Sequence, residues 1–511
     1  MMTKIAKRVM FQGTGSHVGK SILCTAFCRI LTQDGYNTAP FKAQNMALNS
    51  YVTRSGGEIG RSTVAQAEAA GADPIVQMNP VLLKPTGNSC SQVILLGQSV
   101  GNYSASDYQN KYSQQAWASV KKALAYMETH YDALVIEGAG SPAEVNLKKN
   151  DIVNMRIAKE CHAPVFLIAD IDRGGALASI VGTLMLLDED ERSLVKGLII
   201  NKFRGDITLL EPALSFLKER TGVPVLGVIP YLDKLGIDDE DSVSLQDMPS
   251  DHVMRDIHIA VMQTPKISNF TDFDALNHEP DVNVRFVQQG DMIGHPDLIM
   301  LPGSKNTTED LLYLKRQGYA KEICELAEEG VPVIGICGGY QMLGEKVCDP
   351  LHVESENDEV EGLGLLPYET SMHGKKNTYQ VLFDCEELPF LDMKFSAKDM
   401  RGYEIHMGET TLTKEAQALF HITQRSESPV DLMDGFINEK HNVFGTYCHG
   451  IFDNDEIRRA VINALRRRKG LEDLPIQFRY RKYKESEFDR LANTVRKNFD
   501  MDAFYKILEN E

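Results

Sequence analysis

A glycine-rich loop near the start of the chain is the feature that most restricts its possible folds. Residues 13–21 read GTGSHVGKS and stand between an apolar stretch at 8–11 and a helix-like run at 22–27. A strand, a glycine loop and a helix in this order bring backbone N–H groups together on phosphate oxygens at the helix N-terminus. The loop therefore predicts a nucleotide site at the start of an α/β unit.

The side chains of this loop suggest how the nucleotide is held. Lys20 suits the terminal phosphates, and the Ser21 hydroxyl suits a magnesium ion. The loop departs from the strict motif because Thr14 stands where that motif has its first glycine. A turn that only joins a strand to a helix is the alternative. The predicted nucleotide-binding residues of the loop are Gly13, Thr14, Gly15, Ser16, His17, Val18, Gly19, Lys20 and Ser21.

A second motif, in the other half of the chain, has the pattern of a nucleophile elbow. Cys337 has glycines on both sides and follows an apolar run at 331–334 that is typical of a buried strand. Small neighbours permit the strained turn that exposes a nucleophile, and the N–H of Gly338 is a candidate oxyanion donor. His449, which follows a strand-like run at 443–447, is the candidate base. A buried structural cysteine is the alternative, which the flanking glycines disfavour.

Size and composition restrict the class of protein. The 511 residues suffice for two or three domains, and 43% hydrophobic with 25% charged residues is typical of a globular protein. No apolar run approaches the ~18 residues of a membrane helix, and the first residues lack a secretory signal, so we expect a cytoplasmic protein that binds no membrane. The nine scattered cysteines indicate neither disulfides nor zinc. The net charge of −18 argues against nucleic acid as a partner. The oligomeric state stays open.

Apolar strand-like runs alternate with helical patterns in both halves of the chain. The first series lies at 8–11, 133–136, 164–169, 197–200 and 225–229. The second lies at 257–261, 297–303, 332–336 and 442–447, and a polar region at 354–430, expected to hold mixed strands, interrupts it. This alternation predicts an α/β protein with two doubly wound parallel-sheet domains.

Changes in composition divide the chain into four predicted parts. Residues 1–235 form the nucleotide-binding domain, and residues 236–255 form an acidic linker. Residues 256–455 form the domain that carries Cys337, and residues 456–511 form a helical C-terminal tail. Within the tail, Tyr505 and Leu508 are the expected contacts with the rest of the molecule.

Polar residues at strand ends complete the predicted nucleotide site. Glu137 closes a buried strand beside a glycine turn, where ligands of open α/β sheets bind, and is the candidate second magnesium ligand with Ser21. An exposed strand-end carboxylate is the alternative. Asn201, at the end of another strand, is a candidate for the adenine edge, and residues 170–175 form a further strand-end site.

A basic residue and a run of amides follow the extended segment at 39–41. Lys42 is a candidate to neutralise a phosphate or an acceptor carboxylate. Gln44, Asn45 and Asn49 could hydrogen-bond a substrate rich in carboxylates and amides. Asn and Ser also favour plain turns, and composition alone leaves the two alternatives open.

Four segments together make the chain resemble the cobyric acid synthase family, which comprises glutamine-dependent amidotransferases of cobalamin biosynthesis. They are residues 42–50, 137–144, 170–175 and 402–408, and the resemblance covers essentially the full length. The phosphate loop is similar to that of dethiobiotin synthetase, whose spacing also has one residue more than the strict motif.

The resemblance implies the fold and the reaction. A P-loop, dethiobiotin-synthetase-like domain would use ATP and magnesium to activate carboxylates as acyl phosphates, and a class I glutamine amidotransferase-like domain would hydrolyse glutamine to supply ammonia. Such a glutamine-hydrolysing amide ligase would convert the b, d, e and g carboxylates of adenosylcobyrinic acid a,c-diamide, a corrinoid, into amides and yield adenosylcobyric acid.

The resemblance also assigns residues in the second domain. It implies that Gly303 is the other oxyanion donor, and that Tyr403, Glu404 and His406 contact the substrate or the other domain, an ordinary strand being the alternative. The wider class I family has an acidic residue two positions after the histidine, whereas this chain has Ile451. We therefore expect Cys337 and His449 to act as a dyad.

Three other functions compete with this one. An a,c-diamide synthase shares both domain types but amidates two carboxylates, and the motif at 42–50 disfavours it. A switch ATPase fused to a glutaminase-like binding domain would not need both Cys337 and His449 in matching contexts. A cysteine peptidase leaves the phosphate loop unexplained.

Overall fold

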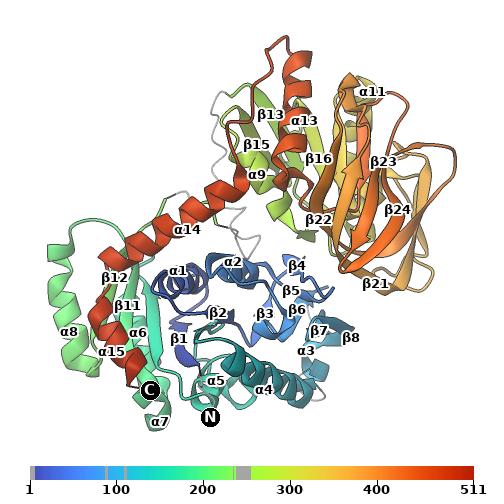
Figure 1. Cartoon of the computed structure of the whole chain (residues 1–511). Coiled ribbons are helices and arrows are strands. Elements are labelled where there is room, and N and C mark those ends of the chain that lie inside the picture. The colour runs from blue at the N-terminus through green and yellow to red at the C-terminus, as the bar shows by residue number, and fades with distance from the viewer. Residues whose placement is uncertain (1–5, 87–89, 109–111, 234, 238–254, 511) are drawn as a thin grey trace.

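The chain forms two lobes in a computed structural model that describes residues 6–86, 90–108, 112–233, 235–237 and 255–510. The predicted linker at 236–255 therefore lies almost wholly outside the described residues. Figure 1 shows the first lobe below and the second above, with the C-terminal helix back on the first lobe. Among the described residues, no helix has the length and apolar character needed to cross a membrane.

A six-stranded parallel sheet organises the first lobe. Its β1 strand, which precedes the phosphate loop, is flanked by β10 and β9, and every pairing is parallel. All five predicted runs of the first series are strands of this sheet, which confirms the α/β prediction. In spatial order the strands are β12 (Val225–Pro230), β11 (Val195–Phe203), β10 (Val165–Asp170), β1 (Lys7–Gly13), β9 (Ala133–Glu137) and β2 (Thr38–Phe41).

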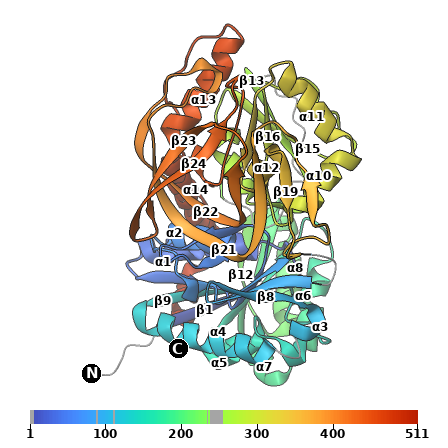
Figure 2. The same ribbon diagram turned by 90° about the vertical axis from the view of Figure 1, so that its right-hand side faces the viewer.

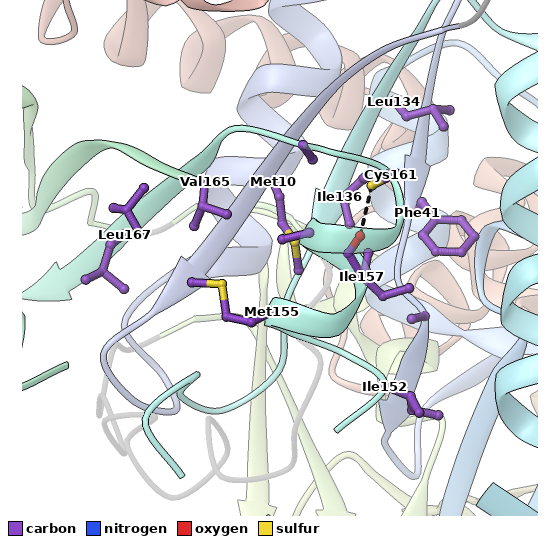
Figure 3. Close-up of a cluster of buried hydrophobic side chains, with 14 of the residues drawn as sticks. Met10, Phe41, Leu134, Ile136, Ile152, Met155, Ile157, Cys161, Val165 and Leu167 are labelled. Carbon is purple, nitrogen blue, oxygen red and sulfur yellow. Dashed lines mark hydrogen bonds between the residues drawn. The ribbon is translucent and has the colours of Figure 1, made fainter. Parts of the chain in front are cut away.

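Side chains that alternate along these strands form a hydrophobic core on each face of the sheet. Val9 and Phe11 of β1 belong to one core, and Met10 between them belongs to the other. Figure 3 shows part of the second core, where strand residues such as Met10 and Ile136 lie near Ile157 of the covering helix. The helices α1 (Lys20–Gln33), α2 (Arg61–Ala69), α14 (Tyr480–Lys497) and α15 (Met501–Glu509) contribute to the first core. The helices α4 (Ser113–His130), α5 (Met155–Glu160), α6 (Ala176–Leu186) and α8 (Glu211–Thr221) contribute to the second.

The polar run that begins at Gln44 opens an insertion between β2 and α4 rather than a plain turn. It contains a four-stranded sheet and a short two-stranded one, and both lie on the side of the first lobe that faces the second (Figures 1 and 2). The larger sheet consists of β3 (Gln44–Met46), β6 (Val81–Pro85), β7 (Cys90–Leu95) and β8 (Gln98–Ser104), and the smaller of β4 (Ser50–Val52) and β5 (Glu58–Gly60).

An eleven-stranded mixed sheet organises the second lobe. Its first five strands are parallel, and four of them lie at the second series of apolar runs, whereas the strand at 282–287 was not predicted. The remaining strands come largely from the polar region 354–430. The parallel strands are, in order, β15 (Val282–Val287), β13 (Ile257–Met262), β16 (Leu298–Leu301), β18 (Val333–Ile336) and β25 (Val443–Thr446). The strands β24 (Ser428–Ile437), β23 (Gln417–Arg425), β21 (Tyr368–Cys385), β19 (Lys346–Cys348) and β20 (Glu359–Glu361) follow, and β22 (Ala397–Leu412) pairs with β21.

Helices cover the parallel part of this sheet, and one short pair of strands lies beside it. The helices are α9 (Asp274–Asn277), α10 (Thr307–Arg316), α11 (Tyr319–Glu328), α12 (Gly338–Leu343) and α13 (Asp455–Arg468). The additional strands β14 (Ile267–Ser268) and β17 (Gly303–Ser304) pair with each other in the antiparallel sense.

The predicted C-terminal tail is helical, but it divides between the two lobes. Its first helix, α13, is fixed to the second lobe by the fully buried Arg458, whose Nε donates to Glu279 Oε1 at 2.8 Å. The helices α14 and α15 cross back to the first lobe, where Leu508 is buried and the Tyr505 hydroxyl donates to Asp34. Both contacts predicted from the sequence are thereby confirmed.

Candidate active sites

The phosphate loop has the geometry expected of an anion site. Gly19 has a φ of 96°, a left-handed conformation that favours glycine, and α1 begins at the next residue. Lys20 Nζ donates to Gly15 O at 2.9 Å and to Gly140 O at 3.2 Å, so it spans the mouth of the loop. Asn201 Nδ2 donates to Val18 O at 2.8 Å from the end of β11. The predicted adenine contact of Asn201 stays a prediction.

Glu137 is the centre of a buried polar cluster next to the loop. It is 1% exposed at the carboxyl end of β9, and its Oε1 accepts hydrogen bonds from Ser21 Oγ at 2.8 Å and Lys42 Nζ at 3.0 Å. Gln66 of α2 donates to its Oε2. A buried carboxylate beside a hydroxyl and the phosphate loop fits a magnesium ion that also takes oxygens from phosphate and water. The exposed strand-end alternative for Glu137 is therefore wrong.

The strand-end segment at 170–175 contacts the phosphate loop through Lys202. Asp170 is 9% exposed, and its carboxylate accepts from Lys202 Nζ at 2.8 Å. Lys202 also donates to His17 O at 2.7 Å. The sequence did not single out Lys202, which lies near the end of β11, or Gln66, which lies in the middle of α2.

A cavity of about 530 Å³ lies beside the loop. Of the residues between 42 and 49 that were predicted to bind the acceptor, only Gln44 lines it. Gln44 and Gly140 line it, together with the aromatic side chain of Tyr108, whose hydroxyl donates to Gln44 Oε1 at 2.6 Å. Lys42 instead belongs to the Glu137 cluster, and Asn45 is buried against Ser62. Asn49 lies at the contact between the lobes and does not line the cavity.

Cys337 occupies the strained turn that the elbow motif predicts. It has φ 53° and ψ −106°, outside the ordinary regions for a residue with a side chain, and stands between β18 and α12. Its N–H donates to Thr446 O at 2.8 Å on the adjacent strand. A methyl group on Gly339 would lie 2.1 Å from Leu301 O, so only glycine permits this tight turn. The turn thus holds the thiol at the carboxyl edge of the parallel strands.

His449 is paired with a carboxylate that the sequence did not indicate. Its Nδ1 lies 2.7 Å from Asp272 Oδ2, and Gly450 N donates to the other oxygen at 2.8 Å. Burial alone would lower the pKa of His449, but Asp272 and Cys337 outweigh it and raise that pKa to about 10. His449 therefore has a buried acidic partner, Asp272, which the expected dyad of Cys337 and His449 did not include. Asp272 comes from a distant segment, 177 residues before His449, which explains why Ile451 can stand where an acidic residue is usual.

The two predicted oxyanion residues meet beside the elbow. A methyl group on Gly338 would lie 2.7 Å from Ser304 N, which adjoins Gly303. A methyl group on Gly303 would lie 3.1 Å from His449 Cε1 and 3.0 Å from Ser268 O. The backbone at Gly338 therefore packs against Ser304, and the backbone at Gly303 packs against His449, so a side chain has little room at either position.

The three residues predicted on β22 have different surroundings. Tyr403 stacks on the His449 ring with centroids 5.1 Å apart, and Glu404 accepts from Arg425 at 2.8 Å. His406 stacks on Tyr447, and burial lowers the pKa of His406 to about 3, which keeps its ring neutral. His406 lines a small cavity of about 30 Å³ together with Cys337.

The lobes share a buried ionic cluster at this small cavity. Lys84 of β6 lines the cavity from the first lobe, and its Nζ donates to Glu58 Oε1 at 2.8 Å. Lys376 of the second lobe donates to Glu58 Oε2 at 2.6 Å. Burial by itself raises the pKa of Glu58, but the two lysines outweigh it and hold that pKa far below its usual range. The two lobes are therefore joined at the edge of the Cys337 site.

Family comparisons agree with the two-lobe architecture. Residues 9–244 match the "CobQ/CobB/MinD/ParA nucleotide binding domain". Residues 258–457 match the "CobB/CobQ-like glutamine amidotransferase domain".

Curated relatives match nearly the whole chain. A cobyric acid synthase of Desulforamulus reducens is 50% identical over 506 residues, which cover 99% of this chain and 98% of the relative. One of Pelotomaculum thermopropionicum is 51% identical over 510 residues, with 99% and 97% covered. One of Moorella thermoacetica is 50% identical over 506 residues, with 99% and 98% covered.

Proposed function

The chain belongs to the cobyric acid synthase family of glutamine-hydrolysing amide ligases, and from that premise we propose that it amidates four carboxylates of one corrinoid. The acceptor is adenosylcobyrinic acid a,c-diamide, its b, d, e and g carboxylates react, and the product is adenosylcobyric acid. The observation that carries the proposal is that a phosphate loop with a buried Glu137 and a Cys337 elbow with a paired histidine occur in two lobes joined by buried ion pairs.

The second lobe supplies ammonia in this proposal. The Cys337 thiolate attacks the side-chain amide carbon of glutamine, and the N–H groups of Gly338 and Gly303 stabilise the oxyanion. The His449 imidazolium gives its proton to the departing nitrogen, so ammonia leaves and a thioester remains. Water then attacks the thioester while His449 takes its proton, which releases glutamate and restores the thiolate. Asp272 holds the imidazole in the required tautomer and stabilises its charged form.

The first lobe activates the acceptor. A corrinoid carboxylate attacks the γ-phosphorus of ATP. ADP leaves from that phosphorus, and the carboxylate becomes an acyl phosphate. Ammonia then attacks the acyl carbon, and phosphate leaves as the amide forms. Lys20 and Lys42 place positive charge at the loop and at Glu137, where negative charge gathers during transfer. Magnesium held by Ser21 and Glu137 would neutralise charge on the phosphates.

The acceptor is proposed to enter through the cavity beside Gly140. That cavity borders the carbonyl of Gly140, which accepts from Lys20, so a carboxylate placed there would lie near the lysine that suits the terminal phosphates. Its aromatic and amide lining, which includes Tyr108 and Gln44, suits a corrinoid edge that carries amides and carboxylates.

Mass spectrometry of the products tests the proposal. Adenosylcobyrinic acid a,c-diamide is incubated with the protein, ATP, magnesium and glutamine, and the amide groups gained are counted over time. Four successive exchanges are expected, and Cys337→Ala should continue to react with ammonium salt but not with glutamine. ATP hydrolysis without any exchange would point to a different carboxylate acceptor, and exchange of only two carboxylates on a less amidated corrinoid would favour an a,c-diamide synthase.

A further inference from the structure

Residues 49–52 belong to the first lobe and end its amide run. They pack against the second lobe and do not line the acceptor cavity. We call them the docking segment. Asn49 and Ser50 are each 1% exposed and Val52 is fully buried, and β22 of the second lobe packs against β4 of this segment. The segment therefore belongs to the contact between the lobes.

Two reciprocal hydrogen bonds attach the docking segment to the backbone before Asp272. The N–H of Phe270 donates to Asn49 Oδ1 at 3.3 Å, and the N–H of Ser50 donates to Asn269 Oδ1 at 3.1 Å. All four residues are buried. Each lobe thus provides one side-chain acceptor and one backbone donor, an arrangement that fixes the register of the two segments.

The attached stretch of the second lobe carries parts of the glutaminase site at both ends. Upstream, Ser268 of β14 pairs with Gly303 of β17, the predicted oxyanion residue. Downstream, Asp272 contacts His449 Nδ1. Between them Asn269 has φ 53°, a left-handed conformation that asparagine tolerates better than most residues. Movement of this stretch would displace the triad acid and the oxyanion backbone together.

A ring contact attaches the docking segment to the other side of His449. The Tyr51 ring lies 5.2 Å from the Tyr403 ring, and Tyr403 stacks on the His449 imidazole at an interplanar angle of 16°. Tyr403 and His449 also exchange two backbone hydrogen bonds, at 3.1 and 2.9 Å. The docking segment therefore approaches His449 through both Asp272 and Tyr403.

Helix α2 fixes the docking segment within the first lobe. The N–H of Arg61, the first residue of α2, donates to Asn49 O at 3.3 Å, and Gln66 of the same helix donates to Glu137. The segment is consequently anchored to the element that also contacts the predicted magnesium ligand.

From these contacts we infer that Asn49 and Ser50 of the first lobe, with Asn269 of the second, are positioning residues for glutamine hydrolysis. They hold Asp272 and the Gly303 strand in register with His449, so the nucleotide-binding lobe completes the glutaminase site. The inference rests on the proposed glutaminase role of the second lobe and goes beyond it, because it makes that activity depend on two hydrogen bonds between the lobes.

Variants at Asn49 in the full chain test the inference. Asn49→Ala removes the acceptor for Phe270 N–H, whereas Asn49→Asp keeps an oxygen in the same place. We expect Asn49→Ala to lower kcat for glutamine hydrolysis by about ten- to a hundredfold and to change KM for glutamine by less than about twofold, because the substrate pocket itself is intact. Asn49→Asp should recover most of the lost kcat. An unchanged kcat in Asn49→Ala, or a loss that Asn49→Asp does not recover, would overturn the inference.

A variant on the opposite side separates positioning from misfolding. Asn269→Gly tolerates the left-handed backbone but removes the acceptor for Ser50 N–H. It should lose glutaminase kcat as Asn49→Ala does, while corrinoid amidation with ammonium salt stays within about twofold of wild type. Loss of ammonium-dependent amidation as well would mean that the fold is damaged and would contradict a positioning role. Failure of the wild-type chain to amidate the corrinoid would instead count against the proposed acceptor.

Discussion

At the level of single residues, charged side chains buried in pairs determine what each site can do. Glu137 is almost fully buried, yet Lys42 contacts it directly and Ser21 and Gln66 add hydrogen bonds. His449 is likewise buried against Asp272. A buried charge is costly unless it is paired and hydrogen-bonded, so removing one partner affects the other more than a surface change would.

Replacing the triad acid tests its proposed role. Asp272→Asn keeps the shape of the side chain but can present an N–H where His449 Nδ1 needs an acceptor, which favours the wrong tautomer. We expect kcat for glutamine hydrolysis to fall by at least about a hundredfold, measured as glutamate release, while ammonium-dependent amidation persists. The matched control is Asp453→Asn, at an exposed residue whose Oδ2 would lie 3.5 Å from a methyl group on Gly450. Equal kcat values for the two variants would argue for a dyad.

The pH dependence of glutamine hydrolysis should report the same contact. Asp272, Cys337 and the stacked Tyr403 face His449, and Asp272 and Cys337 raise its pKa to about 10 against the effect of burial. A raised pKa means that the imidazolium keeps its proton to higher pH, so the alkaline limb of kcat/KM should lie near pH 10 rather than near the ordinary histidine value. In Asp272→Asn the limb should move to lower pH. A limb that stays in place would show that Asp272 does not set the protonation of His449.

Glu137 allows a matching test of the first lobe. Glu137→Gln keeps the size of the side chain but removes the negative charge opposite Lys42 and the predicted magnesium ligand. Corrinoid amidation with ATP and ammonium salt should fall by at least about a hundredfold, and glutamate release by the second lobe should continue. The exposed Glu160 of the same lobe offers a control, Glu160→Gln, which should amidate as wild type does. Full amidation by Glu137→Gln would contradict its role.

At the level of secondary structure, the last two helices complete the first lobe. Phe499 and Phe504 pack on Phe27 of α1, with ring centroids 5.2 and 4.8 Å apart, and Phe504 also lies 5.6 Å from Phe166 of the sheet. Arg496 of α14 adds an ion pair with Asp34 at 2.7 Å. The C-terminal end of the chain therefore covers one face of the sheet in the first lobe, which the N-terminal part of the chain forms.

Truncating one of these rings should destabilise the first lobe. Phe504 is fully buried, so Phe504→Ala loses its burial and leaves a cavity against Phe27, at a cost of about 3 to 5 kcal/mol. The control Tyr505→Phe removes only a hydrogen bond near the surface and should cost at most about 1 kcal/mol. Urea unfolding followed by circular dichroism compares the two midpoints. Equal midpoints would show that α15 adds little to the stability of the first lobe.

At the level of the whole molecule, the contact between the lobes coincides with the glutaminase cavity. Strands β21 and β22 meet the first lobe near their middles (Figures 1 and 2), where Thr378 Oγ1 donates to Gly56 O at 2.7 Å. Lys84 lines the cavity that contains Cys337, and Glu58 joins it to Lys376. The same residues therefore join the two lobes and surround the nucleophile.

Removing one charge from this contact should uncouple the two reactions. Lys376→Met leaves Glu58 buried with only Lys84, which weakens docking by about 3 to 5 kcal/mol. We expect more glutamine to be hydrolysed per amide formed than in wild type, because ammonia escapes at a loosened contact. The exposed neighbour offers a control, Lys375→Met, which should behave as wild type. The same ratio of glutamate to amide in both variants would exclude this role for Glu58 and Lys376.

Local patterns in the sequence were sufficient for the two chemical motifs and for most strands of both parallel sheets. The loop at 13–21, the Cys337 elbow and the runs of apolar residues each depend on neighbours within a few positions, because backbone conformation and strand burial are decided locally. Glu137 was also identifiable, since parallel strands present their carboxyl ends at a common ligand edge.

Only the tertiary structure identified Asp272 and the true position of Asn49. Asp272 meets His449 across 177 positions of sequence, and no spacing rule connects them. Asn49 belongs to a polar run that suits a substrate or a turn equally well, and the docking of a second lobe determines which groups it meets. Hydrogen bonds between distant segments depend on how whole sheets pack, so the sequence determined the chemistry of each site and the tertiary structure decided which residues complete it.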